Sequence, residues 1–191
     1  MSVVGNTDVF AIESCITNAY ESRALLALGS FMLHVGGKCY GVDRPDASLL
    51  ACSFDEVARR IENRGRHLAP FAQHKCAGDI ADAVFATIYG TRFPEYPNFG
   101  LSESEMRNVI QSSRMIWAPD GDQAFDDGSY LLQFDEGNTV RLIGFRVGDD
   151  ERHIHETLSD VVLPAVSFYE LLQAWKTSFE RLWHAAPKTK Q

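Results

Sequence analysis

The residues with the clearest chemical potential are carboxylates gathered in one part of the chain. The stretch from Trp117 to Asp160 holds eleven Asp and Glu against three Arg, so it accounts for the whole net charge of −8. Its densest part, W-A-P-D-G-D-Q-A-F-D-D-G-S-Y-L-L-Q-F-D-E at 117–136, contains no Lys or Arg. We call Asp120, Asp122, Asp126 and Asp127 the acidic turn. Such a cluster can hold a cation, supply a general acid and base, or attract a cationic partner, whereas a merely solvated turn is the simpler alternative.

The spacing of the acidic turn excludes an EF-hand. With Asp120 in the first position, the fifth, sixth and twelfth positions are Ala124, Phe125 and Leu131, where the motif needs Asp or Asn, Gly and Glu. An irregular calcium site stays open, so the alternative function is a calcium- or metal-dependent enzyme that uses the Asp120–Asp127 carboxylates. Asp-Gly clusters more often only form turns, because their side chains bond to their own backbone.

Other catalytic and binding chemistries find little support. No G-x-S-x-G elbow or phosphate-binding glycine loop is present, and His153 and His155 in R-H-I-H-E are better explained by a polar loop than by a metal site. The basic run R-R-I-E-N-R-G-R-H at 59–67 is interleaved with Glu62, which indicates a solvated helix face. The net negative charge argues against nucleic-acid binding, and no cofactor is expected.

Length and composition predict one globular domain over residues 1–185, with a flexible tail at 186–191. The four Cys lack C-x-x-C spacing and are expected to be reduced, mostly buried thiols. The N-terminus has no basic region before an apolar run, and no apolar stretch is long enough to span a membrane. These features predict a cytoplasmic protein that does not bind a membrane.

The elements that must position the carboxylates can be predicted from periodicity and capping signals. Strands are expected at 9–20, 28–35 and 38–42, with a hairpin turn at Gly36-Gly37, and a second hairpin at 129–135 and 139–147. Helices are expected from Ser53 and from Ser102, each with an S-x-x-E capping box, at 75–89, and from about Pro164 along an apolar face that ends at Trp183. The predicted fold is therefore α+β: an antiparallel sheet built from the N-terminal strands and the later hairpin, packed with three to four helices including a C-terminal amphipathic helix.

Four stretches resemble bacterial immunity proteins of polymorphic toxin systems, specifically the immunity protein 42 family. They are V-G-N-T-D-V-F-A-I-E at 4–13, V-G-G-K-C-Y-G-V-D-R-P-D-A at 35–47, S-F-D-E-V-A-R-R-I-E-N-R-G at 53–65 and W-A-P-D-G-D-Q-A-F-D-D-G-S-Y-L-L-Q-F-D at 117–135. The resemblance implies a cytoplasmic protein that binds and blocks a cognate toxin domain. It implies no enzymatic activity and no cofactor. The protein is expected to be a monomer or a dimer.

The charge pattern agrees with this implied role. A nuclease toxin needs a cationic surface to hold phosphates, so an inhibitor with clustered carboxylates can occupy that surface and be steered toward it. Trp117 is expected in the core, whereas strand alternation does not decide which way Tyr130 points. The candidate toxin-binding residues are Asp120, Asp122, Asp126, Asp127, Tyr130, Asp135 and Glu136.

Overall fold

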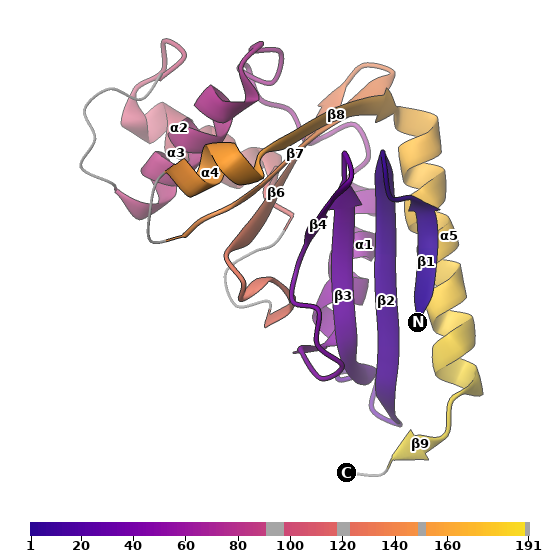
Figure 1. Ribbon diagram of the computed structural model, residues 1–191. Coiled ribbons are helices and arrows are strands. Elements are labelled where there is room, and N and C mark those ends of the chain that lie inside the picture. Colours follow the sequence, from indigo (N-terminus) through magenta and orange to yellow (C-terminus); the bar gives the residue numbers. More distant parts are fainter. Residues whose placement is uncertain (91–97, 118–122, 149–151, 190–191) are drawn as a thin grey trace.

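The fold is described by a computed structural model, which covers residues 1–90, 98–117, 123–148 and 152–189 (Figure 1). Within these residues the chain forms two sheets, antiparallel apart from one short parallel pairing, and five α-helices, so the α+β prediction is confirmed. The later hairpin does not extend the N-terminal sheet as expected but belongs to a second sheet. None of the helices in the described ranges combines the length and apolar composition that crossing a bilayer requires.

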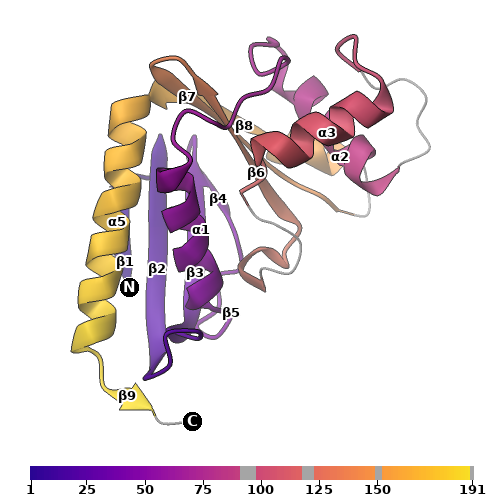
Figure 2. The same cartoon turned by 180° about the vertical axis from the view of Figure 1, so that it is seen from behind.

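The first sheet is built from the N-terminal strands in the order β1-β2-β3-β4. Its strands are β1 (Ser2–Asn6), β2 (Phe10–Tyr20), β3 (Ala27–Val35), β4 (Lys38–Tyr40), β5 (Ser48–Leu49) and β9 (Lys188–Thr189). The predicted turn between β3 and β4 is confirmed, with φ of 57° at Gly36 and 80° at Gly37, values that a tight hairpin needs and glycine adopts without strain. Helices α1 (Leu50–Glu62) and α5 (Ala165–Ala185) cover one face of this sheet (Figure 2).

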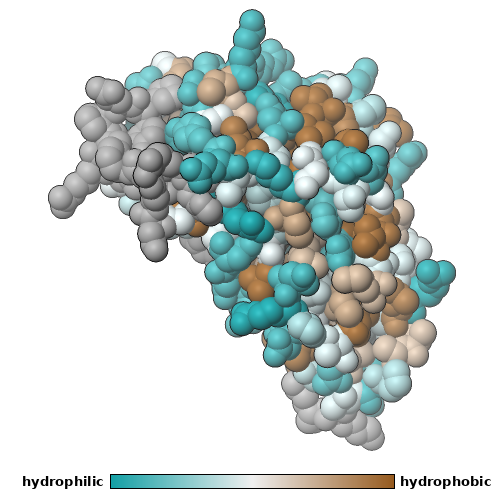
Figure 3. All heavy atoms as spheres, in the orientation of Figure 1, coloured by the Kyte–Doolittle hydropathy of each residue, from teal (hydrophilic) through white to brown (hydrophobic). Residues whose placement is uncertain are grey.

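The opposite face of the first sheet is open in Figure 1, and its surface is mixed, with tan and brown hydrophobic residues among teal hydrophilic ones (Figure 3). Glu13 on β2 and His34 on β3 are diagonal neighbours in the sheet, with Oε2 of Glu13 and Nε2 of His34 2.8 Å apart. Val3 on β1 is paired with Glu13 and is 48% exposed. Scattered apolar side chains of this kind are ordinary on a protein surface.

The second sheet contains β6 (Ser129–Glu136), β7 (Thr139–Arg146) and β8 (Ser159–Pro164), with the predicted hairpin between β6 and β7. Almost every residue of β6 and β7 is buried, because both faces of this sheet are covered. Leu131 and Leu142 belong to the core shared with the first sheet and α5, whereas Leu132 and Phe145 belong to a second core. A sheet buried on both faces explains the nearly continuous apolar runs.

The second core lies under three further helices, which are α2 (Ala77–Tyr89), α3 (Glu103–Ser113) and α4 (Arg152–Thr157). Helix α2 ends as predicted at Gly90, whose φ of 63° is left-handed. The segment R-H-I-H-E, expected as a polar loop, forms part of α4 instead. Strand β8 was not predicted, and Pro164 is the N-cap of α5 rather than its first residue.

Two further expectations differ from the structure. The four thiols are free, but Cys52 and Cys76 are exposed and Cys15 and Cys39 are only partly buried, so the expectation of mostly buried thiols is wrong. The segment expected as a flexible tail includes β9, which pairs in parallel with Ala19 and Tyr20 at the end of β2. These two residues of the C-terminal segment are therefore held by the first sheet.

The two predicted capping boxes have different outcomes. Ser102 caps α3, since its Oγ accepts a bond from the Glu105 N–H and the Glu105 carboxylate accepts one from the Ser102 N–H. Ser53 caps nothing, because α1 begins three residues earlier with Leu50, which is fully buried. The buried Ser53 Oγ has no hydrogen-bond partner among the described atoms.

This contrast gives a stability prediction. Replacing Ser102 with Ala should lower the free energy of unfolding by about 1 kcal/mol, because the N-cap bond is lost. Replacing Ser53 with Ala should change it by less than about 0.5 kcal/mol, because no bond is lost. Urea unfolding followed by circular dichroism measures both, and an equal loss in the two variants would contradict the assignment of the caps.

Candidate functional site

The acidic turn is only partly described, and its described members differ. Asp120 and Asp122 lie outside the described residues. Asp126 is exposed, and it follows the short 3₁₀ helix η1 (Gln123–Phe125). Asp127 is half-buried: its Oδ2 accepts a bond from Arg146 Nε at 3.0 Å, and its Oδ1 accepts one from the Ser129 N–H at 3.1 Å. Asp127 thus holds the start of β6 in place, whereas Asp126 is free to meet a partner.

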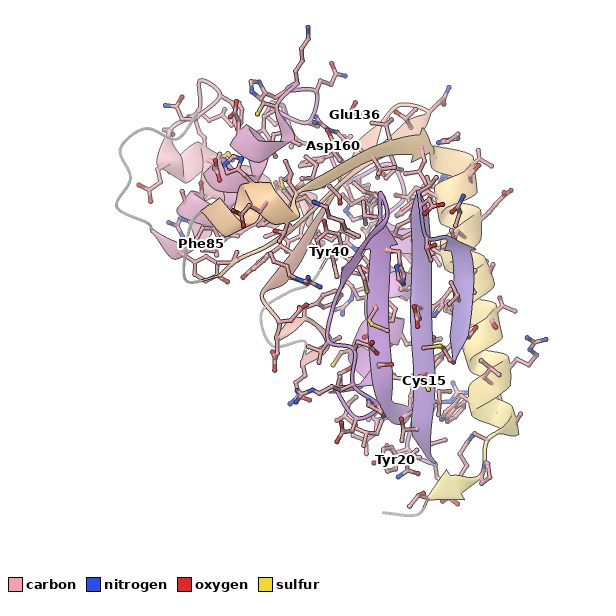
Figure 4. All side chains as sticks on the ribbon, viewed as in Figure 1. Cys15, Tyr20, Tyr40, Phe85, Glu136 and Asp160 are labelled. Carbon is pink, nitrogen blue, oxygen red and sulfur yellow. The ribbon has the colours of Figure 1, made fainter. Side chains whose placement is uncertain are left out.

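Asp135 and Glu136 lie at the other end of β6. Because β6 has eight residues, its ends are roughly 23 Å apart. Glu136 is half-buried, and Figure 4 shows it at the β6–β7 turn. Its Oε1 is buried without a hydrogen-bond partner among the described residues. Asp135 and Glu136 therefore lie well apart from Asp126 and Asp127, the described members of the acidic turn.

Asp135 is buried and belongs to an internal network. Its Oδ1 accepts bonds from the Tyr169 hydroxyl at 2.8 Å and from Gln133 Nε2 at 3.2 Å. Its Oδ2 accepts one from the His67 N–H at 3.2 Å, and its own N–H donates to the His67 carbonyl. Burial and the bond to Asp135 raise the pKa of Tyr169. Both oxygens of Asp135 are therefore used to join β6 to α5 and to the loop after α1.

Tyr130 is half-buried at the start of β6, close to the acidic turn in sequence. Its ring stacks on Phe145 with centroids 5.4 Å apart, and its hydroxyl bonds to the hydroxyl of Tyr89. Tyr89, at the end of α2, is 46% exposed and also packs against Phe85, which Figure 4 labels near this edge of the second sheet. Helix periodicity gave no reason to expect Tyr89 beside Tyr130, because only the pairing of α2 with the second sheet brings them together.

The largest difference between the sequence prediction and the structure is at Arg60. The basic run at 59–67 was expected to be a solvated helix face, but Arg60 is 1% exposed. Its guanidinium donates to Gln133 Oε1 at 3.0 Å and to the Ile116 carbonyl at 2.5 Å, and it pairs with Glu56 Oε1 at 3.0 Å. It also lies over the ring of Trp117, 4.7 Å from the centroid. Burial lowers the pKa of Arg60 to about 10, so the group stays charged at neutral pH.

His67 lies beside Arg60 and is also buried. Its Nδ1 is 3.0 Å from the Ser113 carbonyl, which can only accept, so Nδ1 carries the hydrogen. Burial and the charge of Arg60 lower the pKa of His67, which favours the neutral ring. The buried Nε2 has no hydrogen-bond partner among the described residues.

A second buried cation organises the other side of the second sheet. Arg141 forms a two-bond ion pair with Asp160 at 2.9 and 2.8 Å, and it donates to the carbonyls of Ala72 and His74. Asp160, labelled in Figure 4, lies on β8. The bond to Asp160 raises the pKa of Arg141. This pair fixes the segment that leads into α2.

The contacts described above join separate elements of the fold. In the described ranges no group of three or more His, Cys, Asp and Glu side chains could hold a metal ion, and the buried polar groups are joined to one another across elements. The molecule is an α+β protein whose buried charged groups link separate elements of the fold. Comparison with known families then identifies it further: the model described as immunity protein 42 matches residues 1–178, and the chain belongs to this family.

A solved structure shows the same fold. The crystal structure of CdiI from Burkholderia dolosa AUO158 is similar with a TM-score of 0.57 and 18% sequence identity, over 93% of this chain and 99% of that one. No curated protein matches the chain. The resemblance predicted from sequence is confirmed, and family membership supports a toxin-neutralising immunity function and implies a non-enzymatic inhibitor.

The geometry around Arg60 predicts a large loss of stability when the charge is removed. Arg60→Met keeps an unbranched stem but removes the bonds to Gln133 Oε1 and the Ile116 carbonyl and the ion pair with Glu56 Oε1. The free energy of unfolding should fall by about 3–5 kcal/mol, the range for breaking a buried ion pair. The matched control is Arg59→Gln. It removes the exposed arginine that also pairs with Glu56, and it should cost less than about 1 kcal/mol. Equal losses in urea unfolding would show that Arg60 is not a structural link.

The lowered pKa of His67 predicts a pH effect with a definite sign. The unfolded chain binds a proton on His67 below its ordinary pKa of about 6.5, whereas the folded chain resists it, so stability rises with pH in that window. Between about pH 5 and 6.5, His67→Gln should be less pH-dependent than the wild type, by at most about 1.4 kcal/mol per pH unit. Exposed His184→Gln is the control. The idea fails if the His67 variant keeps the full wild-type slope.

Proposed function

We propose that this immunity protein inhibits its toxin in the cytoplasm without catalysis, and that exposed carboxylates of the acidic turn bind a cationic surface of the toxin, such as the phosphate-binding surface of a nuclease. The observation that carries the proposal is the concentration of the whole net charge of −8 between Trp117 and Asp160. Arg141 and Arg146 in that stretch are already paired, with Asp160 and Asp127. Asp135 is bonded inside the protein, so the exposed carboxylates such as Asp126 are the part of the charge that an outside partner can meet.

Asp126 supports the proposal most directly, because it is exposed beside η1. Asp120 and Asp122 complete the contact in this proposal. Asp127 supports them indirectly, since its two oxygens already hold Arg146 and the Ser129 N–H. A rigid start of β6 lowers the entropy that is lost when the neighbouring carboxylates are bound.

Tyr130 provides an aromatic anchor for the same contact. Tyrosine is frequent at binding hot spots, where an apolar ring and a polar tip meet the partner together. The stacking on Phe145 and the bond to Tyr89 hold Tyr130 in one orientation. Tyr89 adds an exposed ring to this surface.

Asp135 and Glu136 lie at the far end of β6, so we place them outside the contact made by the acidic turn. Asp135 has both oxygens bonded inside the protein. Replacing Asp135 would therefore disturb the fold and lower toxin affinity only indirectly. Variants used in binding studies should keep Asp135 unchanged.

The proposal is tested by the rate of association with the toxin domain encoded next to this gene. The variant combines Asp120→Asn, Asp122→Asn and Asp126→Asn, and it keeps Asp127. Its association rate constant at low salt should fall about tenfold, and its salt dependence should be weaker, because electrostatic steering is lost. Binding is measured by surface plasmon resonance at several salt concentrations.

The control changes the same number of exposed acids elsewhere, through Asp8→Asn, Glu21→Gln and Glu170→Gln. If both triple variants associate equally fast, the acidic turn is not the binding surface, although the immunity function stands. If the wild type does not bind at all, the choice of this toxin is wrong.

A further inference from the structure

A cavity of about 290 Å³ lies between the second half of α1 and the segment that follows α3. It is close in size to the lower limit of ligand pockets, roughly 300 Å³. Its walls include Arg59, Arg60, Arg114 and Asn63, with Glu56 as the acid. The basic run at 59–67 thus supplies one wall of a pocket, a role that its sequence did not indicate.

The charges of this cavity oppose those of the whole chain. Three guanidinium groups face one carboxylate, in a protein whose net charge is −8. Glu56 is shared between Arg59 Nε at 3.3 Å and Arg60 Nη2 at 3.0 Å. Arg114 is exposed and takes part in no ion pair with the described residues. A local excess of positive charge therefore remains at the mouth of the cavity.

Two buried side chains in the wall carry atoms without a partner. Arg60 and His67 are 1% and 2% exposed, and neither Arg60 Nε nor His67 Nε2 has a hydrogen-bond partner among the described atoms. A buried polar atom left without a bond costs about 1–3 kcal/mol. Native proteins usually avoid this cost, so such atoms in the wall of a cavity point to a ligand that bonds to them.

Arg114 also has an unusual backbone. It is the C-cap of α3 and has φ of 50°, a left-handed conformation that is uncommon for residues other than Gly, Asn and Asp. The left-handed conformation does not by itself stabilise an arginine. Its guanidinium, with a planar set of donors suited to two oxygens, is the part that a ligand would use.

We propose that this cavity binds an oxyanion, either the phosphate group of a small molecule or a carboxylate that a toxin side chain presents. Arg59 and Arg114 would donate to the oxygens at the mouth, and Arg60 Nε would donate from the wall. His67 Nε2 carries no hydrogen in the neutral ring, so it would accept a bond from a protonated oxygen of the ligand, such as the P–OH group of a hydrogen phosphate. The carboxylate source rests on the proposed function, whereas the phosphate source does not depend on any toxin.

The first experiment uses the protein alone and titrates it with inorganic phosphate. The side-chain resonances of His67 should move in the NMR spectrum, because an anion nearby changes its environment. Arg114→Asn removes the guanidinium and keeps a residue that tolerates positive φ, and it should weaken binding about tenfold, the loss expected for one bond to a charged group. Arg107→Gln is the matched control, because it removes an exposed charge from the same helix outside the cavity.

The second experiment measures the toxin complex with the same two variants. Phosphate binding that Arg114→Asn weakens and Arg107→Gln does not supports a small phosphate ligand. Without phosphate binding, a toxin complex weakened only by Arg114→Asn supports a carboxylate of the toxin. The inference is overturned if neither phosphate nor toxin binding separates the two variants. If the wild type binds no toxin, the proposed function fails, and the phosphate titration alone then tests whether the cavity binds an oxyanion. The two failures can therefore be told apart.

Discussion

The guanidinium of Arg60 carries a full charge into the space where α1 meets the second sheet. Removing such a charge from water is costly, and the cost is offset by the bonds and the packing around the group. Glu56, Gln133 and the Ile116 carbonyl provide these bonds, and Trp117 packs on its face. Since these partners come from α1, β6 and the segment before the acidic turn, the position of each depends on the others.

The network continues from Gln133 to Asp135, Tyr169 and His67, and so joins α5 and the loop after α1 to the same point. Arg141 and Asp160 do the same on the other side of the second sheet. Apolar burial in the two hydrophobic cores does not by itself require one arrangement of the helices and sheets, because it is not directional. Bonded polar groups between the two cores instead require one relative placement of the helices and sheets.

Sequence patterns predicted the elements whose signals are local. The β6–β7 hairpin follows from two apolar runs joined at Gly137 and Asn138, and the α2 stop follows from Gly90. The capping boxes show that a local signal is not sufficient. Ser53 and Ser102 have the same motif, but α1 begins before Ser53, at the buried Leu50. Helix boundaries depend on tertiary packing as well as propensity, so a motif alone does not decide them.

The candidate site was predictable to a smaller degree, for a related reason. A count of carboxylates cannot distinguish Asp126, which is exposed, from Asp135, which is bonded on both oxygens, although they are only nine positions apart. Likewise Arg59 and Arg60 are neighbours in sequence, yet one is exposed and the other is buried, because adjacent helix residues point about 100° apart. Side-chain roles of this kind are decided by partners from distant elements, which no local pattern encodes.

The position of Trp117 connects the internal network to the surface. Its ring covers Arg60, its backbone N–H donates to the Leu131 carbonyl, and the chain passes from it directly into the acidic turn. On the other side, Ala124 is buried and its carbonyl accepts the N–H of Val42, so the return into β6 is also held. Both ends of the carboxylate-rich segment are thus attached to the rigid body. A partner that binds there meets a surface whose anchors are already ordered, and less of its binding free energy is lost in ordering them.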